Sequence, residues 1–285
     1  MPVWNGERYL AEAIESILTQ TFQDFEFLIL DDGSTDSTPE ILTRFAKADS
    51  RIRVIPLNHE GIVVALNRGV SEAKSEWIAR MDCDDIAHPR RFELQMAALT
   101  ANPQAVLCHT GVRLIGDPAY MARQQRFPRS KAMVALRLCY QSPIVHPSVV
   151  FSKAAFAKAG SYRAEERHAE DYGLWGRLLP FGDFIGLPKP LLSFRIHQGS
   201  ISKQKAETQL NLTRKIAIRH CQLFMSLNAV EAEKSHLAII SEKSDNGLRD
   251  WFWFLYKCLP RMKWQSLEIW AWAVKQSTSR IGKVG

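Results

Sequence analysis

Three carboxylates stand within four residues of the chain, at Asp82, Asp84 and Asp85. They follow directly on an apolar stretch, residues 76–81, that is typical of a β-strand. Aspartate is depleted in strands, and neighbouring carboxylates repel one another unless a cation or a donor-rich ligand offsets their charge. The Asp-x-Asp spacing suits hard divalent ions, and Mg²⁺ or Mn²⁺ commonly adds substrate phosphate oxygens to one or two carboxylates. The motif therefore indicates a cation with a nucleotide diphosphate, although a lone copy favours a solvated turn.

A second acidic segment, residues 31–36, follows another apolar stretch, residues 25–30. Asp, Gly, Ser and Thr all form turns, so the segment by itself favours a turn before a helix. The next residues, 37–40, have the pattern of a capping box, with Pro39 near the first turn of the helix.

Strands and helices alternate along the first part of the chain. The apolar spacing predicts helices over residues 10–18 and 60–74 and after residue 37, and strands over residues 25–30, 51–55 and 77–81. This alternation implies right-handed βαβ units and a parallel sheet. Both acidic segments follow strand ends, which is where open α/β sheets bind nucleotides.

Composition excludes several classes of protein. The 285 residues are 46% hydrophobic and 24% charged, which fits one catalytic-sized globular domain with an appendage. Five scattered cysteines show neither disulfide nor zinc spacing. No run approaches the roughly 18 apolar residues of a membrane-spanning helix, and no signal peptide is visible. We therefore expect a cytoplasmic protein, free or peripheral on the inner face of the cytoplasmic membrane.

The formal charge of +7 is concentrated in the tail. From residue 211 onward, twelve Lys and Arg face six Asp and Glu, so the first 210 residues are nearly neutral and nucleic-acid binding is not expected. Five of the eight tryptophans also lie in this tail. Aromatic and basic residues over 251–283 suit an anionic membrane surface, and they suit a folded helical subdomain equally well.

Six blocks of sequence follow one another along the chain: Pro2-Val3-Trp4-Asn5-Gly6, Gln20-Thr21-Phe22, Asp31-Asp32-Gly33-Ser34-Thr35-Asp36, Met81-Asp82-Cys83-Asp84-Asp85, Glu170-Asp171-Tyr172-Gly173-Leu174-Trp175 and Arg195-Ile196-His197. They occur in the order seen in family 2 glycosyltransferases, which the chain resembles over roughly residues 1–205. The resemblance implies an α/β fold in which a mostly parallel central sheet is flanked by helices, the A-type glycosyltransferase fold. A helical region over 206–285 would follow this catalytic domain.

The resemblance also implies roles on the donor side of a site. Asp31 and Asp32 would contact the base of the nucleotide, and Trp4 would pack near it. Asp82 would contact the ribose or a metal-bound water. Arg68 lies in a segment that borders the nucleotide in the family.

By the same resemblance, Asp84 would bind Mn²⁺ or Mg²⁺ and Asp171 would be the catalytic base. His197 would be a second metal or phosphate contact, although a His alone favours a structural role. His146 and Glu170 are weaker candidates for the acceptor side; a capped turn explains His146 equally well.

The implied activity is inverting transfer of a sugar from a nucleotide diphosphate sugar, uridine-based, to a saccharide or lipid-linked acceptor in cell-surface polysaccharide synthesis. A carboxylate would take the acceptor proton, and a divalent ion would neutralise the departing diphosphate. Two alternatives stay open: a nucleotidyltransferase that makes sugar nucleotides, and a non-catalytic binding protein on a degraded glycosyltransferase scaffold.

The chain departs from the family pattern at its start. An apolar strand precedes the Pro-Val-x-Asn-Gly block in the family, whereas here the block begins at Pro2. Such a strand would be central, and its loss would expose backbone groups of its neighbours. We hypothesise that the true start lies upstream or that the strand was lost from a degraded or mis-started coding sequence.

Overall fold

The computed structural model describes residues 1–118, 124–125, 128, 130–197, 206–240, 250–251, 253–262 and 267–281. The chain divides into two compact units, Met1–Phe127 with Ile144–Gln204, and Pro128–Pro143 with Lys205–Gly285. No sequence pattern predicted that residues 128–143 belong to the second unit.

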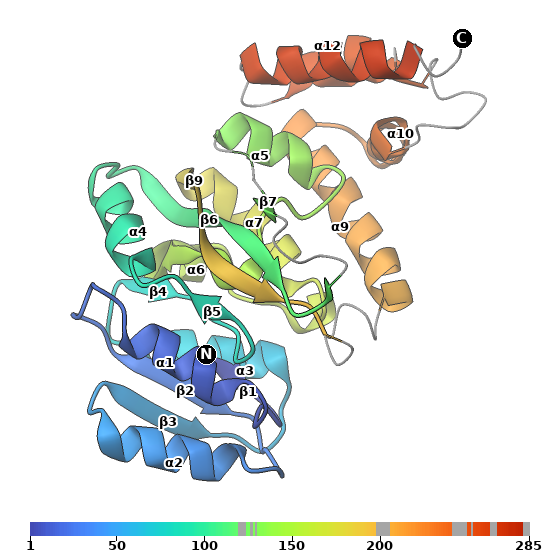
Figure 1. The fold of residues 1–285 in the computed structure, drawn as a ribbon. Helices are drawn as coiled ribbons and strands as arrows, with labels where there is room; N and C mark the ends of the chain where they lie inside the picture. Colours follow the sequence, from blue (N-terminus) through green and yellow to red (C-terminus); the bar gives the residue numbers. More distant parts are fainter. Residues whose placement is uncertain are drawn as a thin grey trace. The chain divides into compact units, whose positions relative to one another are not determined.

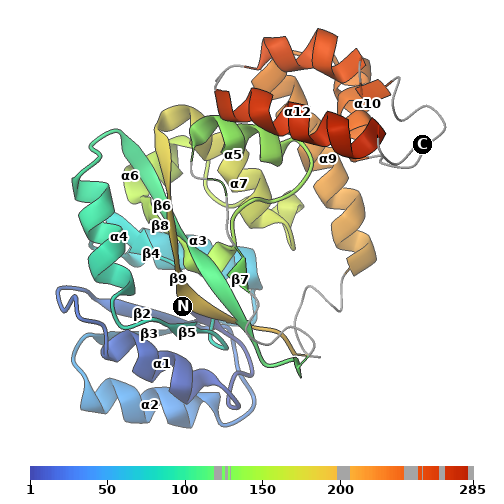
Figure 2. The same cartoon turned by 45° about the horizontal axis from the view of Figure 1, so that its top comes forward.

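The first unit begins with a parallel three-stranded sheet in the order β1-β2-β3 (Figure 1). Its elements are β1 (Pro2–Val3), α1 (Leu10–Leu18), β2 (Phe27–Asp31), α2 (Thr38–Ala48), β3 (Ile52–Pro56) and α3 (Ile62–Glu72). Helices α1 and α2 cover one face and α3 covers the other (Figures 1 and 2). Because both faces are covered, every residue of β2 is buried, which explains its continuous apolar sequence.

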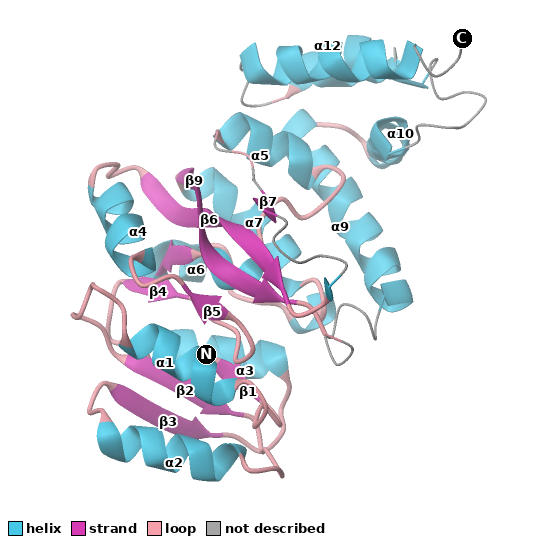
Figure 3. Cartoon of the chain, viewed as in Figure 1, coloured by secondary structure: helices cyan, strands magenta, loops and turns pink. Residues whose placement is uncertain are grey.

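A second, mixed sheet completes this unit, in the order β4-β8-β6-β9-β5 with β7 paired to β6. Only β6 and β9 run parallel; the other pairs are antiparallel. The strands are β4 (Trp77–Ala79), β5 (Ile86–Ala87), β6 (Ala105–Ile115), β7 (Gln124–Gln125), β8 (Val150–Ser152) and β9 (Asp183–Arg195). The helices are α4 (Arg91–Thr100), α6 (Lys153–Lys158) and α7 (Glu170–Leu178), and Figure 3 shows helices flanking the strands. The expected α/β fold flanked by helices is confirmed. The described strands form one parallel and one mixed sheet rather than a single mostly parallel one, and β4, expected in the parallel series, pairs antiparallel with β8.

One hydrophobic core serves both sheets. Ile14 and Ile17 of α1 belong to the same buried cluster as Ile29 of β2, Met81 beyond β4 and Val112 of β6. The loops that follow β2 and β4 are therefore held by a shared core.

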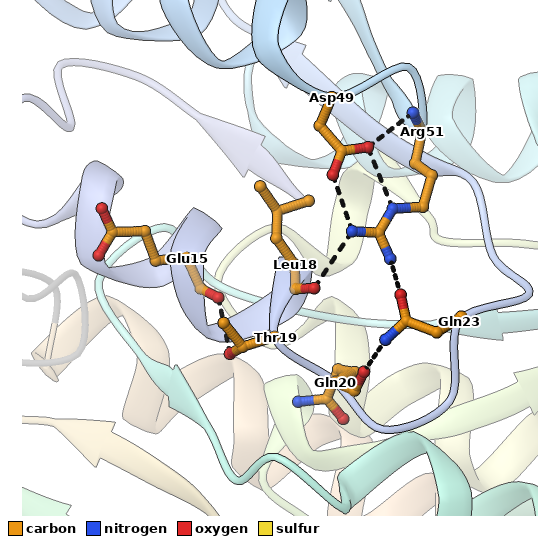
Figure 4. A network of polar contacts seen from close by, with 7 residues as sticks. All are labelled: Glu15, Leu18, Thr19, Gln20, Gln23, Asp49 and Arg51. Carbon is orange, nitrogen blue, oxygen red and sulfur yellow. Dashed lines mark hydrogen bonds and ion pairs between the residues drawn. The ribbon is translucent and has the colours of Figure 1, made fainter.

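Arg51, just before β3, ties three segments together (Figure 4). Its guanidinium donates to the Asp49 carboxylate (2.7 Å), the Leu18 carbonyl (3.1 Å) and the side-chain oxygen of Gln23 (2.7 Å). It also lies 4.6 Å from the centre of the Phe25 ring. These contacts fix the end of α1 and the segment leading to β2 against β3.

The predicted capping box at the start of α2 is wrong. Ser37 makes no side-chain capping bond. Instead, Asp36 accepts hydrogen bonds from the backbone N–H groups of Thr38 (3.0 Å) and Glu7 (3.1 Å). The Glu7 carboxylate in turn accepts from the Ser37 N–H at 3.0 Å. Contacts with the loop after β1 thus replace the local cap.

The elements of the second unit include the helices α5 (Lys131–Leu138), α9 (Ala206–Met225), α10 (Ala229–Ile240) and α12 (Leu267–Ile281). Trp251 is fully buried, lies 5.4 Å from the Phe254 ring and donates to the Ser277 hydroxyl at 2.9 Å. Trp251, Phe254, Cys258 and Met262 recur at helical spacing and are all buried, so this apolar stripe packs inside the second unit. Trp270 is exposed, and Trp264 lies outside the described residues. In the part of the chain that is described, no helix has both the length and the apolar character needed to cross a membrane.

Candidate active site

β2 ends at Asp31, and Asp32 begins the loop that follows it; both side chains are buried. The Asp32 carboxylate accepts hydrogen bonds from the backbone N–H groups of Glu60 (2.7 Å) and Gly61 (2.8 Å). Asp31 accepts from the Ser34 N–H at 3.1 Å. Both carboxylates therefore fix the shape of the loop, and a ligand would use the lone pairs that these bonds leave over.

Trp4 lies at the rim of this loop, with 54% of its surface exposed. Its ring centre is 4.7 Å from that of His59, whose Nδ1 lies 3.2 Å from the backbone oxygen of Asp32. The neighbouring Asn5, at φ +51°, accepts a hydrogen bond from the Thr35 N–H at 2.8 Å. An exposed ring beside a fixed acidic loop can stack against a planar base.

Gly6 brings the two acidic loops together. A Cβ at this position would lie 2.7 Å from the Val3 side chain and 3.4 Å from the Cys83 sulfur. The Gly6 N–H donates to the Thr38 hydroxyl at 2.9 Å. The segment after β1 thus contacts the loop after β2 on one side and the loop after β4 on the other, and glycine permits this close approach.

The loop after β4 gathers Asp82, Asp84 and Asp85, with one oxygen of each within 4.8 Å of the others. Burial raises the pKa values of the Asp84 and Asp85 carboxyls, and the nearby Asp82 raises them further. One oxygen of the buried Asp85 accepts from the Arg195 N–H at 2.8 Å. Its other oxygen has no hydrogen-bond partner among the described residues. Crowded carboxylates with an unpartnered buried oxygen fit a hard divalent cation such as Mg²⁺ or Mn²⁺.

His197 lies beside this cluster. Its Nε2 is 2.9 Å from a carboxylate oxygen of Asp84, and its ring centre is 5.4 Å from that of Tyr9. Nearby, Arg195 donates through Nε to the Asp84 backbone oxygen (2.7 Å) and through Nη2 to the Glu12 carboxylate (2.6 Å). Asp84 is therefore held through both its side chain and its backbone.

Two arginines that sequence reasoning missed lie next to the acidic loop. Arg80 is buried and ion-paired with Asp82. Arg91 is fully buried and donates to the backbone oxygens of Arg80 (2.8 Å) and Val149 (3.2 Å). Burial lowers the pKa of Arg91 to about 10. The only signal in the sequence was an arginine directly before Met81, at the end of an apolar strand pattern.

Asp171 is the second residue of α7 and is half-buried. Burial raises its pKa to about 7, with the neighbouring Glu170 adding to the shift and the Tyr172 N–H and Arg80 opposing it. Glu170 is buried as well and accepts from the His168 N–H at 2.6 Å. A carboxylate with a pKa near neutrality is suited to accept a proton as a general base.

An ion pair fixes the helix that carries Asp171. Arg177 donates to the buried Glu166 carboxylate at 2.5 Å and to the backbone oxygens of Ala159 (3.0 Å) and Ser161 (2.8 Å). A Cβ at Gly173 would overlap the Glu166 carboxylate. The glycine in this sequence block therefore allows α7 to approach its anchor.

Tyr162, also missed from the sequence, links α7 to the acidic loop. Its hydroxyl lies 2.7 Å from His146 Nε2, and its backbone N–H and C=O bond to the Asn67 side chain at 3.1 and 2.9 Å. Burial raises its pKa; Arg80 opposes this, and Asp171 and Asp82 add to it. The hydroxyl is therefore close to charges from both parts of the site.

His146 and Arg68 have different surroundings. His146 is buried, its ring lies edge-on to Trp175 at 5.8 Å, and burial together with Arg80 lowers its pKa, which keeps it neutral. Arg68 is exposed on α3 and pairs with Glu72 at 2.7 Å rather than with another predicted site residue. The structure thus places His146 against Tyr162 and Trp175, and the predicted roles of His146 and Arg68 stay predictions.

Comparisons with known proteins agree with this geometry. Residues 1–159 match the model of the family described as Glycosyl transferase family 2. The chain is 31% identical over 207 residues to the O-antigen biosynthesis glycosyltransferase WbnJ of Escherichia coli, covering 71% of this chain and 80% of that protein.

Two solved structures show the same fold. S. aureus TarS 1-349 in complex with UDP-GlcNAc has a TM-score of 0.65 at 17% identity, covering 91% of this chain and 80% of that one. The mannosyltransferase PcManGT from Pyrobaculum calidifontis, in complex with GDP-Man and Mn²⁺, has a TM-score of 0.55 at 14% identity and covers 98% and 85%.

Proposed function

Because the chain belongs to glycosyl transferase family 2, we propose that it is an inverting, metal-dependent glycosyltransferase. It moves a sugar from a nucleotide diphosphate sugar, uridine-based, to a saccharide or lipid-linked acceptor. The observation that carries the proposal is the pairing of Asp171, whose pKa is about 7, with the carboxylate cluster of Asp82, Asp84 and Asp85. Transfer needs both a proton acceptor and a place for a cation that binds phosphate.

In the proposed reaction, an acceptor hydroxyl oxygen bonds to the anomeric carbon of the donor sugar. The bond from that carbon to the diphosphate oxygen breaks, and the nucleoside diphosphate leaves with the electron pair. Asp171 takes the proton of the hydroxyl, and one displacement inverts the anomeric centre. The Glu166–Arg177 pair holds α7, so Asp171 needs little reorganisation to reach the proton.

The acidic loop serves the departing side. When bound there, a divalent cation would neutralise charge that develops on the diphosphate. Asp84 is the central ligand in this proposal, with His197 orienting its carboxylate at 2.9 Å. Mn²⁺ is the first ion to test, because PcManGT was solved with it.

The loop after β2 serves the nucleotide. Asp32 and Asp31 offer acceptors to the donor groups of a base, and Trp4 offers an exposed ring beside them. TarS was solved with UDP-GlcNAc, which supports a uridine nucleotide as the first donor to test. The name of WbnJ supports surface polysaccharide assembly as the setting, on the cytoplasmic side where we expect the protein.

Calorimetric titration tests the donor site. The parent chain should bind UDP in the presence of Mn²⁺ and lose most of that affinity in EDTA. Asp84→Asn should abolish the metal dependence, whereas Glu40→Gln, an exposed acid on α2, should change nothing. A folded chain that binds no nucleoside diphosphate under these conditions would contradict the proposal.

A turnover assay then separates the alternatives. Release of UDP from a panel of UDP-sugars, with saccharide and lipid-linked acceptors, is the expected result. Binding without release across the panel would favour the non-catalytic scaffold. Formation of UDP-sugar and pyrophosphate from UTP and sugar phosphates would favour the nucleotidyltransferase.

A further inference from the structure

The three carboxylates of the loop after β4 have unequal partners. One oxygen of each lies within 4.8 Å of the others, so three negative charges meet in a small space when all three groups are ionised. The Asp84 carboxylate contacts an imidazole, and that of Asp85 accepts one backbone N–H group. Among the described residues, only Asp82 of the three is ion-paired with an arginine, Arg80. The fold therefore compensates one of the three charges with a fixed cation.

The end of β4 holds Arg80 in place. Arg80 follows this strand directly and is buried. Its backbone N–H donates to the Val149 carbonyl at 3.0 Å, and its own carbonyl accepts from the Arg91 guanidinium at 2.8 Å. Because both backbone groups are bonded, the Arg80 side chain extends from a fixed point two residues before Asp82. Its guanidinium can therefore hold the Asp82 carboxylate in one position.

Two other arginines near the loop have different partners. Arg91 is fully buried, and within the described part of the chain its guanidinium donates to backbone oxygens and to the Gln95 side chain (3.0 Å) rather than to a carboxylate. The Arg195 guanidinium pairs with the exposed Glu12 carboxylate at 2.6 Å. Arg80 is thus the described arginine that forms an ion pair within the acidic loop itself.

This ion pair makes the carboxylates of the loop unequal as ligands. If Asp82 moved to bind a cation, Arg80 would be left as a buried charge without its partner, which is costly. Asp85, by contrast, has an oxygen with no hydrogen-bond partner among the described residues. The positive charge of Arg80 also repels a free divalent cation and attracts the phosphate groups of a nucleotide. Arg80 should therefore have opposite effects on the binding of the two ligands.

From these observations we propose that Arg80 is a positioning residue of the acidic loop. Its ion pair keeps Asp82 from binding the cation directly, so that Asp84 and Asp85 bind it. Because Arg80 opposes the free cation and favours the nucleotide, each ligand strengthens the binding of the other and the two bind together. This inference rests on the proposed function, since it requires a divalent cation and a nucleoside diphosphate at this loop.

Titrating the full chain with Mn²⁺ alone, followed by the electron paramagnetic resonance signal of free Mn²⁺, tests the effect on the cation. Arg80→Met should bind Mn²⁺ about tenfold more tightly than the parent, because a nearby positive charge is removed and Asp82 becomes available. In saturating Mn²⁺, calorimetry should show that the same variant binds UDP about tenfold more weakly. Damage to the fold would weaken both ligands, so the opposite directions distinguish the proposed role from a structural one.

A double variant, Arg80→Met with Asp82→Asn, tests whether Asp82 is a ligand. Removing both partners leaves no unpaired buried charge, so this variant should fold even where Arg80→Met alone does not. If Asp82 does not bind the cation, the double variant should bind Mn²⁺ within about threefold of the parent. Arg80→Lys keeps the charge and should restore most of the UDP affinity that Arg80→Met loses.

Arg90→Met is the matched control, because it removes an arginine from a surface ion pair with Glu93. It should change neither affinity. Weaker Mn²⁺ binding by both Arg80→Met and the double variant would overturn the inference, because Asp82 would then act as a ligand. A folded parent chain that binds neither Mn²⁺ nor UDP would instead overturn the proposed function, and this inference with it.

Discussion

Aspartates lie at the ends of both β2 and β4, but their carboxylates have different hydrogen-bond partners. Asp32 receives two backbone N–H groups at 2.7 and 2.8 Å, and Asp31 receives one at 3.1 Å. In the loop after β4, Asp84 and Asp85 crowd against Asp82, and one buried oxygen of Asp85 has no partner among the described residues. Backbone N–H groups thus hydrogen-bond to the carboxylates of Asp31 and Asp32. Among the described residues, the second loop keeps a carboxylate oxygen without a partner, and a ligand can bind there.

Residue type and strand position do not by themselves define a cation site. A carboxylate that accepts backbone N–H groups contributes to the shape of its loop. Carboxylates that are buried beside one another have raised pKa values and gain most from a cation. Substitutions in the two loops should therefore have different effects.

The largest effect should come from outside both loops, at Asp171. We expect Asp171→Asn to lower the rate of transfer by roughly 10²–10⁴-fold, because the amide cannot take the acceptor proton. UDP affinity should stay unchanged, since both loops are intact. Comparing product formation with calorimetric binding of UDP checks this. Loss of UDP binding in Asp171→Asn would instead show that Asp171 acts on the donor.

The second-largest expected effect is on UDP binding, and its dependence on metal should differ between the two loops. Asp84→Asn should weaken UDP binding by about 10–100-fold in Mn²⁺ and have little effect in EDTA. Asp32→Asn should weaken binding by a similar factor in both buffers, because its role does not involve the cation. Calorimetric titration of both variants with UDP, in Mn²⁺ and in EDTA, measures this difference in affinity. Equal losses of affinity for the two variants in each buffer would contradict the expected difference between the loops.

The pH profile should report Asp171 rather than either loop. A general base works when deprotonated, so kcat/KM should rise about tenfold per pH unit below about 7 and level off above it. Initial rates measured from about pH 5.5 to about pH 8.5 determine the part of the profile in which kcat/KM rises. A flat profile would mean that another group accepts the proton or that chemistry does not limit the rate.

The smallest effect is on stability and has opposite directions in the two loops. Asp32→Asn should lower the free energy of unfolding by about 1–3 kcal/mol, because an amide can no longer accept from both N–H groups. Asp85→Asn should raise it in EDTA, because a buried charge is removed.

The change in the free energy of unfolding that Asp85→Asn causes should depend on pH. The pKa of Asp85 is raised in the folded chain, so the stability contributed by its protonated form is lost as the pH rises above the unfolded value of about 4. The gain from Asp85→Asn should therefore be larger at pH 7 than at pH 4. Urea unfolding at both pH values measures it, and a loss at pH 7 would show that Asp85 supports the fold.

The fold class, the family and the two acidic segments could be predicted from the sequence alone. Alternating apolar runs predicted the parallel pairing of β2 with its neighbours, because a strand covered on both faces must be apolar throughout. The order of the six motif blocks predicted the family, which the match over residues 1–159 confirms. Local patterns were sufficient here because each is set by neighbours in the chain.

Only the tertiary structure decided which groups meet. Arg80 reaches Asp82, Tyr162 reaches His146, and Asn67 rather than Arg68 reaches Tyr162. Asn67 and Tyr162 are 95 residues apart in the chain, so no local pattern relates them. The cap of α2 was mispredicted for the same reason, since Asp36 bonds to Glu7 across the fold. Burial, which raises the pKa of Asp171, likewise depends on everything packed around it and is fixed only when the chain has folded.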